Sequence, residues 1–203
     1  DEHQFGVFEL GANHAGEIAY TSGLVRPCAA VIINVGTAHL EGFGSREGIA
    51  RAKSEIYDGL AADGTAIVNL DDDFASLWLG KLAGRKLLTF SERQTADIYA
   101  TDITSGDMPQ YAFTLHIGTQ AMPVQLQLLG RHQVMNALAA ASLAHACGIS
   151  LSRIVAGLQK TRAFSGRTVP HSLGRQRYVI DDTYNANPSS MKAAIDLLAE
   201  LPG

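Results

Sequence analysis

Several features that would mark a secreted, membrane or nucleic-acid-binding protein are scarce or absent in this sequence. It has two cysteines, Cys28 and Cys147, in no metal-type spacing, and two isolated cysteines are typical of reduced thiols in the cytoplasm. No apolar run approaches about 18 residues, and the start is not a signal peptide, so we expect no membrane insertion. The net charge is -4 and no basic run occurs, so we expect no nucleic-acid partner.

The composition is that of a folded α/β protein. Hydrophobic residues make up 46% and charged residues 18% of the chain, which allows a filled core without disulfides. Through the first 90 residues, apolar β-rich runs alternate with runs of helical spacing. This alternation predicts a mostly parallel sheet flanked by helices. The expected strands are 5–10, 29–35, 65–70 and 86–90, and the expected helices are 45–60, 73–82 and one that ends at 24.

The pattern changes after residue 90. Three strand-like runs without a helix between them predict an antiparallel meander at 98–103, 111–117 and 124–128. Two helices should follow at 132–146 and 151–159, and then a hairpin around Gly174. A length of 203 residues suits one domain and part of another. We therefore place a domain boundary near Phe164, with a linker at 165–167.

The stretch at residues 181–191, DDTYNANPSSM, is the most informative part of the chain. It joins a short apolar strand at 178–180 to a run of helical spacing that ends at Leu201, and Pro188 suits the first turn of that helix. A strand end that faces a helix N-terminus is a common place for phosphates and sugars in α/β proteins. The alternative is a capped turn whose Asp and Asn side chains satisfy local backbone groups.

Glu9 and His39 follow the first two expected strands. In a parallel sheet both would lie at the carboxyl edge, where ligands bind. A carboxylate and an imidazole there could hold a divalent metal, although Mg²⁺ prefers oxygen ligands. The alternative is that each is a loop residue that bonds to its neighbours. Asn13 and His14 lie on the loop after Glu9, and the sequence assigns neither a role.

Lys53 lies in an apolar stripe of the helix expected at 45–60, together with Ile49, Ile56 and Leu60. A lysine in such a stripe must extend its amine to solvent, find a partner or lose charge. The alternative to a functional role is that Lys53 simply extends its amine to solvent. Glu55 lies nearly opposite on this helix and is not expected to pair with Lys53.

Four motifs, in order along the chain, resemble those of one enzyme family. They are ELGANHAGEI, NVGTAHLEGFGS, LLGRHQVMNALAA and DDTYNANPSSM, and they resemble motifs of the Mur ligases. The first and last are typical of the branch that adds D-alanyl-D-alanine. The resemblance implies that residues 1–163 form the Mur ligase central domain, which binds ATP and magnesium. It implies that residues 164–203 form the linker and the start of a Rossmann-like C-terminal domain.

The resemblance also implies a catalytic and metal-binding set. In the family, the residues that match Glu9 and His39 bind Mg²⁺. The lysine that matches Lys53, in the string AKSE, is carbamylated, which turns an ammonium into a carboxylate that helps to bind a second Mg²⁺. The resemblance therefore assigns Glu9, His39 and Lys53 to catalysis and to the metal.

Five residues match family positions that bind the nucleotide. Gln133 departs from the family pattern, which has Asn there, so a specific contact from that position is in doubt. Without the resemblance, these residues would be regarded as helix, linker and turn residues. The implied ATP-binding residues are His132 and Asn136 at the adenine and ribose, Arg167 at the phosphates, Asp182 at the ribose or hinge, and Asn185 at the γ-phosphate.

The implied activity is that of an ATP-dependent acid–amino-acid ligase of peptidoglycan precursor synthesis, which serves cell wall biogenesis, cell shape and cell division. The full enzyme would take UDP-MurNAc-tripeptide and D-Ala-D-Ala, and we expect a monomer. The chain contains no GxxxxGK[ST] motif, with which the family holds the ATP phosphates. We therefore expect that the sequence is a piece of a longer protein and is inactive on its own.

Two alternatives remain open. A folylpolyglutamate synthase would share the fold and the type of reaction, although the loop after Glu9 and the motif at 181–188 argue against it. A metal-dependent hydrolase would use Glu9, His14 and His39 to hold a metal-bound water, and it would need no nucleotide.

Overall fold

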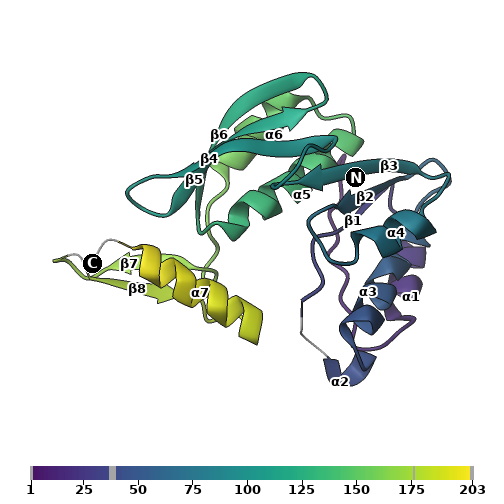
Figure 1. Cartoon of the computed structure of the whole chain (residues 1–203), viewed down its shortest axis with the longest axis horizontal. Helices are drawn as coiled ribbons and strands as arrows, with labels where there is room; N and C mark the ends of the chain where they lie inside the picture. Colours follow the sequence, from purple (N-terminus) through teal and green to yellow (C-terminus); the bar gives the residue numbers. More distant parts are fainter. Residues whose placement is uncertain (1, 37–39, 176, 202–203) are drawn as a thin grey trace.

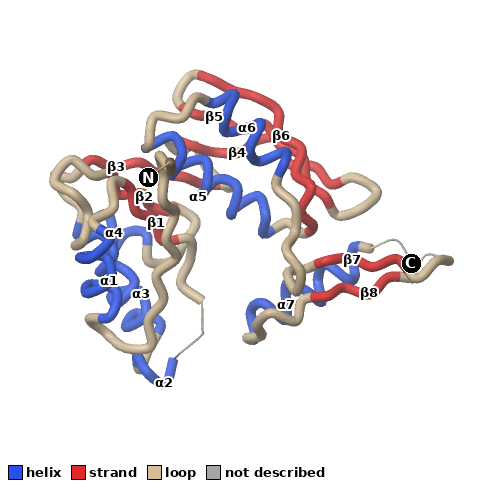
Figure 2. The backbone as a smooth tube through the Cα atoms, turned by 180° about the vertical axis from the view of Figure 1, so that it is seen from behind, coloured by secondary structure: helices blue, strands red, loops and turns tan. Residues whose placement is uncertain are grey.

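The computed structural model describes residues 2–36, 40–175 and 177–201 and shows an α/β architecture (Figures 1 and 2). The elements are α1 (Glu17–Val25), β1 (Ala29–Ile32), α2 (Leu40–Phe43), α3 (Arg46–Ser54), the 3₁₀ helix η1 (Glu55–Tyr57), β2 (Thr65–Asn69), α4 (Ala75–Lys81), β3 (Lys86–Ser91), β4 (Ile98–Ser105), β5 (Gln110–Ile117), β6 (Gln120–Leu129), α5 (His132–Ala146), α6 (Leu151–Lys160), β7 (Val169–Ser172), β8 (Tyr178–Asp181) and α7 (Pro188–Glu200).

The central element is a sheet in the order β1-β2-β3-β4-β5-β6. The pairs from β1 to β4 are parallel, and β4, β5 and β6 form an antiparallel meander. The predicted switch from alternating strands and helices to a meander is therefore confirmed. The hairpin predicted around Gly174 is also present, as the separate pair β7–β8.

Two hydrophobic clusters fill the two faces of the sheet. All five residues of β2 are buried, as expected for a parallel strand that is covered on both sides. Ile67 belongs to the cluster under α5 and α6, whereas its neighbours Ala66 and Val68 belong to the cluster that includes Ile49 and Trp78. Because side chains alternate along a strand, one short run supplies both clusters. The parallel half of the sheet is thus covered on both faces, with its carboxyl strand ends at one edge.

The strand predicted at residues 5–10 is wrong. This segment has no regular secondary structure, and Phe5, Val7 and Phe8 are 58%, 90% and 64% exposed. Its apolar, β-rich composition fits a strand, but a strand needs a hydrogen-bonded neighbour. Within the part of the chain that the structure describes, β1 pairs only with β2, so this segment gains no neighbour.

The helix predicted at residues 45–60 is shorter than expected. It begins after Ser45, whose side chain accepts a hydrogen bond from the Gly48 amide, and α3 ends at Ser54. The chain then tightens into η1, where the Tyr57 hydroxyl donates to the Ile67 carbonyl at 2.8 Å. Beyond η1, Gly59 lies close against α1, so the segment predicted as the end of one helix packs by contacts that are distant in sequence.

The last unit of the described chain consists of β7, β8 and α7. It follows residues 161–168, which connect it to α6 and include Phe164, where the domain boundary was predicted. As predicted, Pro188 stands in the first turn of α7, and Asn187 and Ser190 form a capping box. None of the described helices has the length and apolar character that a membrane crossing requires.

Candidate nucleotide and metal site

The carboxyl end of β1 is fixed by side chains from β2, from α3 and from the turn before α4. The Asn69 amide donates to the Ile33 carbonyl at 2.8 Å, and the Lys53 Nζ donates to the Asn34 carbonyl at 3.0 Å. Asp72 accepts a hydrogen bond from the Val35 amide at 2.7 Å. These bonds order the strand end that leads toward the motif containing His39, which lies outside the described residues.

Asp72 and Asn69 are contributors that the sequence interpretation missed. The signal was a run of three aspartates directly after a buried strand, at 71–73. The other oxygen of Asp72 accepts from the Phe74 amide at 2.9 Å, so its carboxylate joins β1 to the turn before α4. These two amides fix the Asp72 carboxylate at the sheet edge, close to Lys53.

Lys53 is half-buried, and burial lowers the pKa of its amine, as expected from the stripe. The negative charges of Asp72 and Glu9 act in the opposite direction and raise this pKa. The structure therefore brings Glu9 and Lys53 within electrostatic reach of each other. Glu9 itself is exposed at the end of the N-terminal segment.

The loop after Glu9 is organised by two glutamates. Glu55 accepts from the amides of Gly16 and Ala19 at 2.8 and 3.1 Å, so it caps the start of α1 and does not pair with Lys53. Glu17 accepts from the Asn13 amide at 2.8 Å. This bond is the main reason why the pKa of Glu17 lies below its usual value.

His14 lies against the same glutamate, with 3.1 Å between its Nδ1 and Oε1 of Glu17. This placement gives it a local role in the loop and does not favour the hydrolase alternative, which needs His14 at a metal. In residues 2–36, 40–175 and 177–201, no three His, Cys, Asp or Glu side chains converge as metal ligands do.

The first turn of α5 carries a chain of polar side chains. The Gln133 amide lies 3.1 Å from His132 Nε2, and its oxygen accepts from the Asn136 amide, also at 3.1 Å. Gln133, the departure from the family pattern, thus joins the two residues expected at the nucleotide. Gly130, with φ of 97°, precedes the turn, and a Cβ there would lie 2.7 Å from the His132 ring. A glycine is therefore required for the ring to take this position.

Partial burial lowers the pKa of His132, while Asp182 and Glu200 act in the opposite direction. Asp182 and Glu200 belong to the C-terminal unit. Their influence places that unit near the start of α5.

A direct contact also joins the C-terminal unit to the sheet. The Tyr111 hydroxyl of β5 donates to Glu200 of α7 at 3.0 Å. The Arg131 guanidinium lies over the Tyr111 ring, 5.8 Å from its centroid, and pairs with Glu92 at 3.5 Å. A row of contacts thus runs from the end of β3 to α7, through Glu92, Arg131, Tyr111 and Glu200.

The linker and the motif at 181–187 fold onto each other. Asp182 accepts from the Thr168 amide at 3.0 Å, and Asp181 accepts from the Gly166 amide at 3.1 Å. The Arg167 guanidinium stacks on the Tyr184 ring at 4.0 Å. Asn185 accepts from the amide of the next residue, Ala186, at 2.8 Å. The local structure is therefore that of a turn whose Asp and Asn side chains satisfy nearby backbone groups, the alternative that the sequence left open. Arg167 is held beside this motif by its stacking on Tyr184.

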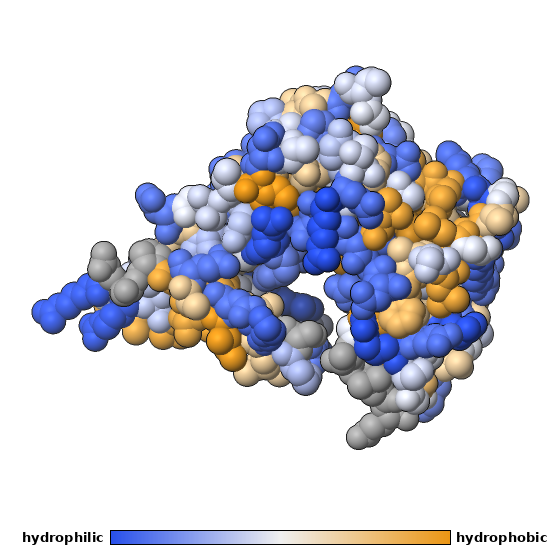
Figure 3. All heavy atoms as spheres, viewed as in Figure 1, coloured by the Kyte–Doolittle hydropathy of each residue, from blue (hydrophilic) through white to orange (hydrophobic). Residues whose placement is uncertain are grey.

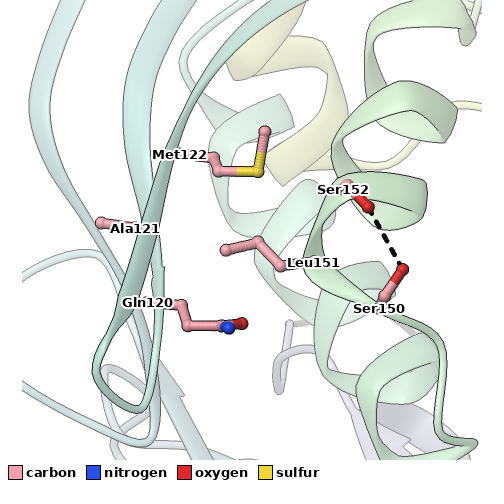
Figure 4. A pocket seen from close by; sticks show the side chains of 6 residues that line it. All are labelled: Gln120, Ala121, Met122, Ser150, Leu151 and Ser152. Carbon is pink, nitrogen blue, oxygen red and sulfur yellow. Dashed lines mark hydrogen bonds between the residues drawn. The ribbon is translucent and has the colours of Figure 1, made fainter.

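A hollow separates the C-terminal unit from the helices that cover β1 and β2, and hydrophilic residues surround much of its rim (Figure 3). A separate shallow pocket lies between the start of β6 and the start of α6 (Figure 4). It is lined by Gln120, Met122, Ser150 and Leu151 among others, with no charged group. We give the pocket no part in catalysis, because the candidate residues lie at the sheet edge and at the start of α5.

Comparisons with known proteins agree with this architecture. The family model described as the Mur ligase middle domain matches residues 1–144. The chain belongs to the Mur ligase family. It is 46% identical over 205 residues to UDP-N-acetylmuramoyl-tripeptide--D-alanyl-D-alanine ligase of Escherichia coli (strain K12), which covers 100% of this chain and 45% of that relative. The ligase of the same name from Haemophilus influenzae is 40% identical over 198 residues, which cover 98% of this chain and 42% of that relative.

Solved structures show the same fold. A crystal structure of MurF from Acinetobacter baumannii matches with a TM-score of 0.93 and 44% identity, over 100% of this chain and 44% of that one. MurF ligase from Thermotoga maritima, in complex with ADP, matches with a TM-score of 0.78 and 26% identity, over 96% of this chain and 44% of that one. The chain spans a little under half the length of the relatives it matches.

Proposed function

We propose that this chain is part of an ATP-dependent ligase that joins D-alanyl-D-alanine to UDP-N-acetylmuramoyl-tripeptide in peptidoglycan precursor synthesis. The observation that carries the proposal is the identity of 46%, along the whole chain, to a relative with that name. Neither the folylpolyglutamate synthase nor the hydrolase alternative has comparable support. We also propose a division into a central domain, 1–163, and the start of a C-terminal domain, 164–203.

The proposed reaction begins with transfer of the γ-phosphoryl group of ATP to the tripeptide carboxylate, which gives an acyl phosphate and ADP. The amine of the dipeptide then attacks the acyl carbon, an amide bond forms, and phosphate leaves. The role of the protein in phosphoryl transfer is to position the groups and to stabilise their charge. His132 and Asn136 would hold adenine and ribose, and Arg167 would reach the phosphates.

Asp182 and Asn185 complete the proposed nucleotide set, at the ribose or hinge and at the γ-phosphate. Both lie in the turn that packs against the linker, so movement of the C-terminal unit would carry them together with Arg167. Support for a nucleotide comes from the linked side chains at the start of α5 and from the relative that was crystallised with ADP.

The residues near the end of β1 fit a divalent cation in their chemistry. Glu9 offers a carboxylate, and its charge already acts on Lys53, whose amine has a lowered pKa. Carbon dioxide adds to a neutral amine, so carbamylation of Lys53 would supply a second anionic oxygen ligand. With His39, these residues would hold Mg²⁺, which would neutralise charge on the transferring phosphoryl group. We propose a cytoplasmic, monomeric enzyme.

The test is phosphate release by the full-length protein. We expect release from ATP only when UDP-MurNAc-tripeptide and D-Ala-D-Ala are both present, with equal amounts of the amide product. Glutamate with a folate substrate is the control for the synthase alternative. Phosphate release with glutamate and the folate substrate would overturn the proposal. Hydrolysis of UDP-MurNAc-tripeptide in the absence of ATP would also overturn it. The 203-residue chain alone should give no turnover, because it contains no P-loop motif.

A further inference from the structure

The two cysteines of the chain meet in the folded protein. Cys28 and Cys147 are 119 positions apart in the sequence, yet their sulfur atoms lie 3.8 Å from each other. Cys28 stands directly before β1, and Cys147 directly after the last residue of α5. Neither takes part in the candidate nucleotide and metal site, which lies at the other ends of these two elements.

The surroundings hold the two residues in place while leaving one thiol accessible. The Cys28 carbonyl accepts from the Thr65 amide at 2.9 Å, and the Cys147 amide donates to the Leu143 carbonyl at 3.1 Å. Cys28 is exposed and Cys147 is half-buried. A disulfide has a sulfur–sulfur length of about 2.05 Å, so the sulfurs must approach by about 1.8 Å. Each side chain can contribute to this approach by turning about its Cα–Cβ bond.

We propose that Cys28 and Cys147 form a reversible disulfide by exchange with a low-molecular-weight disulfide. The Cys28 thiolate attacks one sulfur of the small disulfide, forms a mixed disulfide and releases one thiolate. Cys147 then gives its proton to solvent and attacks the Cys28 sulfur. The protein disulfide forms and the second small thiolate leaves. Two protein thiols are oxidised and one small disulfide is reduced to two thiols.

The order of attack follows from exposure. A small disulfide can reach Cys28 from solvent, whereas burial and the contact with Cys28 raise the pKa of the Cys147 thiol. Cys147 therefore acts second, on a sulfur that is already beside it. The product ties the start of β1 to the end of α5, the helix whose first turn carries His132 and Asn136. Oxidation would clamp this helix against the sheet.

The experiment exposes the full-length protein, under native conditions, to oxidised glutathione. Peptide mapping by mass spectrometry should find the Cys28 and Cys147 peptides joined and lighter by two hydrogens, and dithiothreitol should separate them. The melting temperature should rise by about 5–15 °C on oxidation, because the link closes a long loop.

Two single variants provide matched controls. Cys147→Ser should stop at the mixed disulfide of glutathione on Cys28, and Cys28→Ser should react more slowly, because its remaining thiol is half-buried. Neither variant should show the rise in melting temperature. If the unsubstituted protein carries glutathione on Cys28 without any joined peptide, or does not react, the proposal is wrong.

Discussion

Lys53 shows how one side chain can satisfy a structural and a chemical demand together. Its side chain is half-buried, and its amine donates to the Asn34 carbonyl at 3.0 Å. Partial burial favours the neutral amine, while Glu9 and Asp72 favour the charged one. This amine, whose pKa is lowered overall, lies beside the end of β1, where phosphoryl transfer is proposed.

A charge-preserving substitution tests this role. We expect Lys53→Arg to lower kcat of the full-length ligase by at least about 100-fold, because a guanidinium forms no carbamate. Lys53→Glu should keep more activity than Lys53→Arg, since it supplies a shorter carboxylate. Steady-state kinetics with thermal melts would measure both effects. Lys81→Arg is the matched control, because Lys81 bonds to Ser54 and Asp58 and has no part in the proposed site. This variant should keep its turnover. Full activity in Lys53→Arg would refute the carbamate.

His132 reports on the approach of the C-terminal unit. The negative charge of Asp182 raises the pKa of this imidazole against the effect of burial. Asp182→Asn removes that charge, so the His132 pKa should fall further. A titration of the ring protons by NMR would measure the change, with Asp107→Asn as a control variant on a distant loop. An unchanged or increased His132 pKa in Asp182→Asn would contradict the arrangement seen here.

At the scale of elements, the contact between α1 and the segment after η1 depends on a missing side chain. A Cβ on Gly59 would lie 2.5 Å from the Ser22 backbone and hydroxyl, and Ser22 is fully buried. The two segments therefore approach more closely than any other residue at 59 would permit. This contact helps to fix Glu55, which caps α1.

Gly59→Ala should therefore destabilise the protein by about 1–3 kcal/mol, as overpacking does. Gly157→Ala is the matched control. Gly157 lies inside α6, and a Cβ there would meet nothing within 4 Å. This second change should stabilise by about 0.5–1 kcal/mol, because alanine favours the helix. Urea unfolding of both variants would decide, and equal effects would show that the contact at Ser22 is not tight.

The sequence predicted elements whose pattern is local and failed where a distant contact decides. The meander and α5 carry clear periodicity and appear within a few residues of their predicted limits. By contrast, nothing local shows that residues 5–10 lack a neighbouring strand or that Tyr57 bonds across to Ile67. Among the candidate residues, Lys53 could be singled out from the sequence because a cation stands out in an apolar stripe, and its role stays a prediction. Asp72 was missed because an aspartate after a strand resembles an ordinary turn residue.

At the scale of the whole molecule, two units face each other across the hollow in Figure 3. One carries the end of β1, and the other carries Arg167 and the motif at 181–187. Arg167 is held by stacking on Tyr184 within its own unit, so Arg167 and the motif that contains Tyr184 can move together. Closure of the hollow would bring this planar cation toward the end of β1, the edge where phosphoryl transfer is proposed. Such closing motions are common in enzymes that exclude water.

Removal of Arg167 should then affect turnover more than folding. We expect Arg167→Ala to lower kcat/KM for ATP by about 100-fold in the full-length protein, while the melting temperature falls by no more than about 3 °C. Arg162→Ala is the control, since Arg162 bonds to the nearby carbonyls of Gln159 and Thr161. Equal kinetics in the two variants would remove Arg167 from the nucleotide site.

The mixed sheet described above also has a consequence for the time course of folding. Neighbouring strands of the meander are joined by short turns, whereas α2, α3 and η1 lie in the chain between β1 and β2. Closing a longer loop costs more chain entropy, and distant pairings form more slowly. The antiparallel half should therefore act as the template on which the parallel half assembles. Pulse-labelled hydrogen exchange during refolding should protect the amides of β5 before those of β1.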